Sequence, residues 1–518
     1  MSIPPLSRRD ALKAGLGAGA ALAAFSLLGD LKDAVAADFS AEELCYMPAS
    51  LQMQLFKRGV LSPVDVLEAQ LARIETYEPK VNAITYKHVE YARKRAKESE
   101  ARWKNGTARP LEGITCGMKD EHGLKGWTFT QGSVLYKDTK FAETDPMAEF
   151  LEAAGAIMHI QTTVPEFYLH FCTWTKLWGV TRNPWNLKYS VGASSGGSGA
   201  ALAAGFTTIA TGSDMGGSIR LPCAWNGLYG YKPPYGRIPT ESTLAPFSGS
   251  GPMARTFEDM VRMYNVMAHP HHTSVSTMPH QELPLTYPSI KGMRIAYVPD
   301  QGWAEVDPEA RAGTDAGVAI LKQLGAKVDV VEAPLGIDDK GISELFSEMA
   351  LSGSMGGAIA ERIDKIGDMT TYGAYFTKKA ASGKYGAAEA TATERKIRAL
   401  HATFVKNIWS KGYDVVINPS INMPHTPADY DYTSAKPTIN GKPVHPLAGV
   451  VQTPVYNFLN WYPVVNVPVG RTSENVPMGM QIVANAYQDK KAMCVAAAFA
   501  GAAPRWYQGK HMPDFRGG

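Results

Sequence analysis

Residues 192–220 read GASSGGSGAALAAGFTTIATGSDMGGSIR, with a Gly/Ser loop at each end of an apolar segment. Between the loops, residues 199–206 have a helical pattern and residues 207–211 a strand pattern. Each loop therefore lies at the end of an element, where backbone N–H groups are unpaired and can face a ligand. Glycine also lets the backbone come close to a substrate. The stretch predicts a helix–strand unit of an α/β protein with a site at its ends.

The second loop ends in a serine that is a candidate nucleophile. Ser218 follows three residues whose amides can converge on one oxygen, as an oxyanion hole requires. A serine nucleophile needs a base, and no histidine lies within or beside either loop. A nearby basic candidate is Lys119, which follows the apolar residues 111–116. Lysine acts as a base only in its neutral form, which burial favours, and a second serine can then pass the proton along.

Other interpretations of these loops are weaker. Residues 192–196 also fit G-x-S-x-G, but that motif needs an apolar strand directly before it, and residues 183–190 are loop-like. A Ser-x-x-Lys motif is absent from the sequence. One Gly/Ser loop alone would be a tight turn, and a lone lysine a solvated surface residue. Two loops with a spaced lysine favour catalysis.

Together these motifs resemble the amidase signature family. Lys119 and Ser194 are 75 positions apart and Ser194 and Ser218 are 24 apart, as in that family, and TRNPWN at residues 181–186 is also typical of it. The similarity extends from about residue 61 to residue 500 and includes residues 463–468 and 478–483. The resemblance implies that Lys119 is the base, Ser194 the bridging serine on a cis peptide, and Ser218 the acylated nucleophile.

The resemblance also assigns supporting roles within the second loop. It implies an oxyanion hole formed by the backbone amides of Met215, Gly216, Gly217 and Ser218, with Asp214 and Arg220 bracing the loops. The chain departs from the family at Ala193, where a second glycine is usual. If Ala193 adopts a positive φ, the cost is roughly 1 kcal/mol, which a well-supported loop tolerates.

The rest of the chain alternates short apolar runs with helical patterns. Strands are expected over residues 156–160, 293–298, 327–331 and 415–417, and helices over residues 308–324 and 391–410. This alternation predicts an α/β fold with a largely parallel or mixed sheet and helices on both faces. The resemblance implies that this is the amidase signature fold. We expect it to form one domain over residues 37–518. Its core is expected at about residues 61–335 and 411–505, with a helical cap or insertion at about residues 336–410.

The N-terminus has the pattern of an export signal. Arg8 and Arg9 precede an apolar stretch over residues 14–28, and Ala34-Val35-Ala36 has the spacing that a signal peptidase accepts. The paired arginines resemble a twin-arginine signal, and the apolar stretch is too short to span a membrane comfortably. We therefore expect residues 1–36 to be a twin-arginine-type signal peptide of an exported, periplasmic or secreted protein. No stable membrane insertion is expected after its removal.

Composition excludes several other classes. Net charge is +3 and no Lys/Arg cluster is interleaved with aromatic residues, so no nucleic acid partner is expected. The five cysteines are widely spaced and include no CxxC pair, which predicts neither a disulfide framework nor a zinc site. The histidines at residues 269, 271 and 272 have no acidic or thiol companion at ligand spacing, so we expect an exposed loop and no metal. No cofactor is expected.

The predicted partner is a small-molecule amide substrate, and a homodimer is left open. Rival functions are the glutaminase-like subunit of a tRNA-dependent amidotransferase, an ester or carbamate hydrolase, and a catalytically silent binding scaffold. The export signal argues against the first, and the intact Lys119, Ser194 and Ser218 argue against the last. Residues 336–386 and 422–456 are expected to shape the pocket. Five aromatic residues are candidates for either pocket or core: Trp174, Trp178, Trp225, Phe458 and Trp461.

Overall fold

The computed structural model describes residues 39–239, 246–332 and 335–517. The predicted signal peptide at residues 1–36 lies outside these residues. In the described part of the chain, no helix is both long and apolar enough to cross a membrane.

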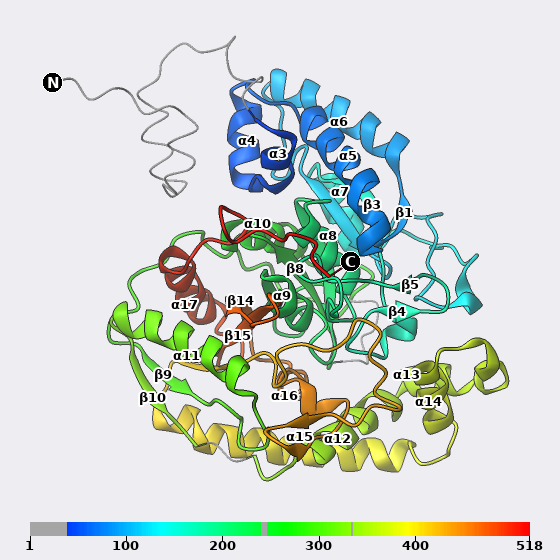
Figure 1. Cartoon of the computed structure of the whole chain (residues 1–518), viewed down its shortest axis with the longest axis vertical. Coiled ribbons are helices and arrows are strands. Elements are labelled where there is room, and N and C mark those ends of the chain that lie inside the picture. Colours follow the sequence, from blue (N-terminus) through cyan, green and yellow to red (C-terminus); the bar gives the residue numbers. More distant parts are fainter. Residues whose placement is uncertain (1–38, 240–245, 333–334, 518) are drawn as a thin grey trace.

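One mixed sheet forms the centre of the molecule (Figure 1). In the described residues it has eleven strands, in the order β1-β3-β2-β6-β8-β7-β14-β15-β11-β9-β10. β2 is parallel to β3 and β6, and β9 is parallel to β10 and β11, while the other pairs are antiparallel. The prediction of an α/β fold with a mixed sheet is confirmed. The strands are β1 Ile84–Lys87, β2 Thr115–Lys119, β3 Ile157–Thr162, β6 Ile209–Asp214, β7 Tyr229–Lys232, β8 Gly249–Ala254, β9 Arg294–Tyr297, β10 Lys327–Val330, β11 Val415–Pro419, β14 Val464–Arg471 and β15 Pro477–Ala484.

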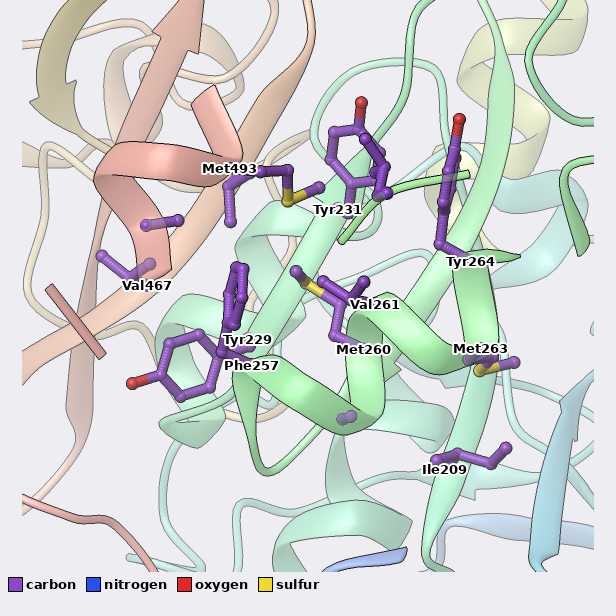
Figure 2. Packing of buried hydrophobic residues seen from close by; sticks show 14 of the residues in the cluster. Ile209, Tyr229, Tyr231, Phe257, Met260, Val261, Met263, Tyr264, Val467 and Met493 are labelled. Atoms are coloured by element: carbon purple, nitrogen blue, oxygen red, sulfur yellow. The ribbon is translucent and has the colours of Figure 1, made fainter. Parts of the chain in front are cut away.

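Helices cover both faces of this sheet, because its strands bury side chains in both directions. Ile209 of β6 packs in the core that holds α10 and α17, whereas its neighbour Ala210 packs in the core that holds α8 and α9. Figure 2 shows the first core, where Met260 and Tyr264 of α10 lie beside the β7 tyrosines. The helices before the cap are α3 Ala41–Tyr46, α4 Ala49–Lys57, α5 Pro63–Val81, α6 Val89–Lys104, α7 Pro146–Ala153, α8 Gly196–Ala204, α9 Arg220–Asn226, α10 Phe257–Met267 and α11 Pro308–Gln323, and α16 Val455–Phe458 and α17 Asp489–Ala502 follow it.

The segment expected to form a cap is helical. It contains α12 Asp339–Leu351, α13 Ser354–Ala360, α14 Thr371–Ala380 and α15 Ala387–Asn407. These helices gather at one end of the molecule, drawn in light green to yellow in Figure 1. α12 packs against α15, and α13 packs against α14. The helices of this segment therefore pack against one another beside the sheet.

The strand order places the ends of two parallel strands side by side. β2 ends at Lys119 and β6 ends at Asp214, and parallel neighbours present their carboxyl ends at the same edge. α8 begins at Gly196, immediately after the Ser194-Ser195 pair, and packs against β2 and β6. This edge of the sheet therefore collects the predicted catalytic residues from three segments of the chain.

Candidate active site

Lys119 is the buried centre of the candidate site. It is the last residue of β2, where Cys116 and Met118 face the opposite core, and its side chain is fully buried. Its Nζ lies 2.9 Å from Ser194 Oγ, 2.6 Å from Ser213 Oγ and 2.7 Å from Glu121 Oε2. The structure thus brings the predicted base and the predicted bridging serine into hydrogen-bond contact.

The first Gly/Ser loop presents Ser194 to Lys119. The Ala193–Ser194 peptide is cis. The positive φ of this loop is at Gly192, with φ 78°, and Ala193 has none, so the strain considered for Ala193 does not arise. The Ser195 amide donates to the Ser218 carbonyl oxygen at 3.2 Å, which places the two loops side by side.

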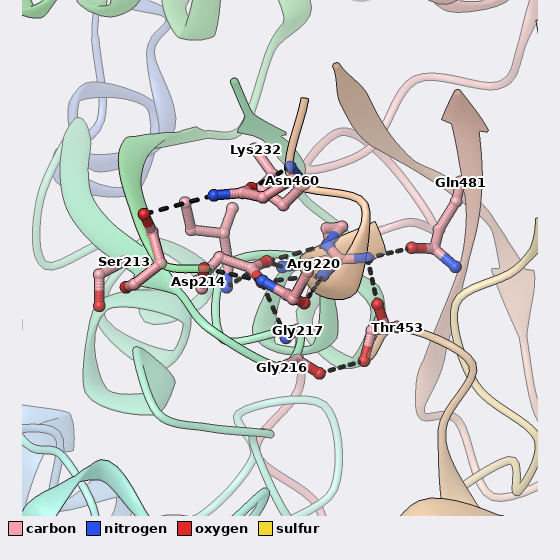
Figure 3. Close-up of polar contacts among 12 residues, drawn as sticks. Ser213, Asp214, Gly216, Gly217, Arg220, Lys232, Thr453, Asn460 and Gln481 are labelled. Carbon is pink, nitrogen blue, oxygen red and sulfur yellow. Dashed lines mark hydrogen bonds and ion pairs between the residues drawn. The ribbon is translucent and has the colours of Figure 1, made fainter. Parts of the chain in front are cut away.

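The second loop is held by the buried ion pair of Asp214 and Arg220 (Figure 3). The Arg220 guanidinium donates to both Asp214 carboxylate oxygens, at 2.9 and 2.8 Å. Its remaining hydrogen bonds reach the C-terminal part of the chain: the Thr453 carbonyl, Asn457 Oδ1 and Gln481 Oε1. Burial alone would raise the pKa of Asp214, but the Arg220 guanidinium and Asn457 hold it well below its usual range. The pair therefore connects the loop that carries Ser218 to the C-terminal part of the chain, and its bracing role stays a prediction.

The loop amides differ in what they contact. The Gly217 N–H donates to Asp214 Oδ1 at 2.8 Å and is therefore engaged by the brace. The amides of Met215, Gly216 and Ser218 donate to no side chain in the described part of the chain. These three of the four amides predicted to form the oxyanion hole are therefore not hydrogen-bonded to the Asp214 carboxylate. The Thr453 hydroxyl donates to the Gly216 carbonyl at 2.6 Å and so fixes the plane of the following peptide.

Two residues of the site were not identified from sequence. Glu121 contacts Lys119, and Ser213 both accepts from Lys119 and donates to Glu121 Oε2 at 2.7 Å. Burial alone would raise the pKa of Glu121, but the charge of Lys119 holds it at about 2. His122 is also buried here, 3.1 Å from Thr211 Oγ1, and burial lowers its pKa to about 4, so its imidazole is neutral near pH 7.

A cavity of about 730 Å³ opens onto these groups. Ser194, Ser213 and Ser218 line it together with Glu121. Both segments expected to shape the pocket contribute, through α12 and α13 and through residues 447–454, and α15 adds further lining. None of the five candidate aromatic residues is among the described residues that line it, and Trp225 and Phe458 are fully buried in the cores.

The walls of this cavity are mainly apolar. Apolar lining comes from Leu169, Phe171, Phe247, Phe346 and Met349. No arginine or lysine occurs among its described lining residues, whereas several carboxylates do. His170 also lines it, and burial lowers its pKa to about 3, so it is neutral near pH 7.

The histidines and cysteines of the chain do not gather at this site as metal ligands. Among the residues with described positions, no group of three or more His, Cys, Asp or Glu residues is arranged to hold a metal ion. His271 lies 3.2 Å from Glu149, away from the cavity lining. All five cysteines are buried and form no disulfide.

Comparison with known proteins identifies the family. The Amidase family model matches residues 65–493. One subunit of the glutamyl-tRNA(Gln) amidotransferase of Symbiobacterium thermophilum is 30% identical over 488 residues, covering 86% of this chain and 94% of that protein. The 6-aminohexanoate-cyclic-dimer hydrolase of Paenarthrobacter ureafaciens is 28% identical over 487 residues, covering 89% of this chain and 95% of that protein.

Solved structures agree with this assignment. A bacterial aryl acylamidase of the amidase signature family superimposes with a TM-score of 0.81 at 25% identity, covering 89% of this chain and 96% of the other. A 6-aminohexanoate cyclic dimer hydrolase complexed with substrate gives 0.77 at 26% identity, covering 89% and 98%. The chain therefore belongs to the amidase family, has the amidase signature fold, and is a hydrolase of amide C–N bonds.

Proposed function

We propose that the chain hydrolyses a carboxylic amide through an acyl-enzyme on Ser218, with Ser194 and Lys119 as the proton relay. One observation carries the proposal: buried Lys119 Nζ lies 2.9 Å from Ser194 Oγ, and Ser194 lines the same cavity as Ser218. In the described residues no histidine or metal cluster offers Ser194 a competing base.

The proposed reaction proceeds in two acyl transfers. Ser218 Oγ attacks the amide carbonyl carbon while its proton passes to Ser194 and the proton of Ser194 passes to neutral Lys119. The oxyanion binds the free amides of the second loop. The C–N bond then breaks as the relay returns a proton to the leaving nitrogen. Water attacks the Ser218 ester by the same relay, which releases the acid and restores the serine.

The cavity supports a substrate that is uncharged and carries an apolar group. Its described lining residues include Phe, Leu and Met side chains and no arginine or lysine, so a carboxylate on the substrate would be buried without a cationic partner. Glutamine carries such a carboxylate. This disfavours the glutaminase-like function despite the 30% identity to the amidotransferase protein. Uncharged esters and carbamates remain compatible with the same chemistry.

We also propose that the mature enzyme acts outside the cytoplasm, without stable membrane insertion and without a cofactor. The support is the sequence of residues 1–36, with Arg8-Arg9, an apolar stretch and Ala34-Val35-Ala36. Fractionation of cells that produce the full chain tests this. Cleaved protein outside the cytoplasm, lost when Arg8 and Arg9 are both replaced by lysine, is expected. Uncleaved cytoplasmic protein would contradict it.

The experiment that tests the function compares the chain from Ala37 with its Ser218→Ala variant. Both are incubated with matched amide pairs, an aryl or alkyl amide and the same compound bearing a carboxylate, and the released amine is measured. We expect turnover by the first protein only, with kcat/KM higher for the neutral member of each pair. Equal turnover by the variant would refute Ser218 as nucleophile, and preference for the carboxylate would refute the substrate class.

A further inference from the structure

A carboxylate contacts the proposed base, although the serine relay does not require one. Glu121 Oε2 lies 2.7 Å from Lys119 Nζ and accepts a hydrogen bond from Ser213 Oγ, also at 2.7 Å. The Glu121 side chain is 28% exposed and lines the cavity, whereas Lys119 is fully buried. The pair therefore lies at the border between the core and the substrate space.

The contacts of Lys119 match the three N–H bonds of an ammonium group. Its Nζ has three oxygen neighbours within hydrogen-bond distance, on Ser194, Ser213 and Glu121. A charged lysine donates to all three and so cannot accept a proton from Ser194. A neutral lysine has two N–H bonds and one lone pair. With Ser213 and Glu121 holding the two N–H bonds, the lone pair points at Ser194.

None of the other described groups around Lys119 places a negative charge at ion-pair distance from its amine. His122 is kept neutral near pH 7 by burial, which lowers its pKa to about 4. The ring of Tyr168 lies 4.9 Å from Lys119 Nζ, and its hydroxyl donates to the Asp120 carbonyl oxygen at 3.0 Å. The Asp120 carboxylate is bound by the amide and hydroxyl of Thr130, and burial raises its pKa to about 6. In the described residues, Glu121 is the one carboxylate in ion-pair contact with Lys119.

We propose that Glu121 is a positioning residue with two effects on Lys119: its charge favours the ammonium form, and its oxygen aims the lone pair of the neutral form at Ser194. The inference rests on the proposed function. The first effect moves the onset of activity to higher pH. The second increases the rate at which the neutral lysine takes the proton from Ser194. Two substitutions separate them, because Glu121→Gln removes the charge and keeps an oxygen acceptor, whereas Glu121→Leu removes both.

The test measures the rate at which a fluorophosphonate labels Ser218, from mildly acid to alkaline pH, together with kcat/KM for a neutral amide. Labelling needs the same proton relay but no knowledge of the substrate. Glu344→Gln is the matched control, since Glu344 of α12 pairs with Lys379 and Lys384 and does not line the cavity.

For Glu121→Gln we expect the midpoint of the rising pH profile to move toward acid by roughly one to three pH units, with an alkaline plateau close to that of the parent. For Glu121→Leu we expect the same displacement and a plateau about ten- to hundredfold lower. Glu344→Gln should change neither the midpoint nor the plateau of the pH profile. An unchanged midpoint in Glu121→Gln would overturn the inference, as would an equal displacement in the control. Failure of the parent to label Ser218 at any pH would overturn the proposed function, and this inference with it.

Discussion

Replacing Arg220 by methionine tests how the loop that carries Ser218 is held. Methionine has a similar length but carries neither charge nor donors. The change removes five side-chain hydrogen bonds, two to Asp214 and one each to Thr453, Asn457 and Gln481. Both partners of the ion pair have fully buried side chains, so no water replaces the guanidinium.

Removing one partner of a buried ion pair typically lowers the free energy of unfolding by about 3–5 kcal/mol. We expect a value near the lower end, because Asp214 keeps hydrogen bonds from the Gly217 amide and from Asn457 Nδ2. The effect should also depend on pH. In the parent, the pKa of Asp214 lies well below its usual range, so the contribution of the pair is complete above about pH 4 and declines only in strong acid. In the variant, burial without a counter-charge raises that pKa, and protonation then relieves part of the cost.

The assay is urea unfolding followed by tryptophan fluorescence, at about pH 8 and about pH 5, for Arg220→Met, Asp214→Asn and the double variant. We expect the loss in Arg220→Met to be smaller at the lower pH. The two single losses should together exceed the loss in the double variant by about 1–3 kcal/mol. A loss below about 1 kcal/mol in Arg220→Met, or strictly additive losses, would refute the bracing role.

Three further predictions concern catalysis. Gly217→Ala should lower kcat about hundredfold. Residue 217 has a φ of 125°, and a Cβ added there overlaps Thr453 and must displace the loop. An unchanged kcat would contradict this placement. Phe346→Ala should lower kcat/KM about tenfold for amides with a bulky apolar group and spare the smallest amides, and an equal loss for both would refute its contact with substrate. Activity of the parent should rise with pH, because a protonated lysine cannot accept the proton of Ser194. The pKa of Glu121 is about 2 and that of His122 is about 4, so neither group changes charge above about pH 6. His122→Asn should therefore leave the midpoint of the rise unchanged. A displaced midpoint would show that the imidazole takes part.

The strands that the sequence predicts are those with a short apolar or alternating run. The runs at residues 156–160, 293–298, 327–331 and 415–417 correspond to β3, β9, β10 and β11 within a few residues. β7 and β8 read YGYK and GSGPMA, where glycine and proline obscure the strand pattern, and the sheet itself holds these segments extended. Resemblance to a family supplied the region of β14 and β15, which local pattern alone did not assign.

The site likewise combines residues that the sequence identifies with residues that only the folded chain brings together. Lys119, Ser194 and Ser218 carry recognisable motifs, and the structure places them in or beside one cavity. Gln481 contacts Arg220 across 261 positions, a pairing that only the folded sheet creates. Glu121 had a local signal, since it lies two residues beyond Lys119. Its contact nevertheless depends on the turn after β2, where the amides of Glu121 and His122 donate to the Lys119 carbonyl oxygen.

Locating the covalent intermediate tests the proposed relay most directly. The chain from Ala37 is reacted with a fluorophosphonate or a slowly hydrolysed aryl amide, digested, and analysed by mass spectrometry. We expect one adduct, on Ser218, which is absent in Ser218→Ala and forms much more slowly in Lys119→Met and Ser194→Ala. An adduct on another serine, or undiminished labelling of Ser218 in Lys119→Met, would contradict the proposed relay.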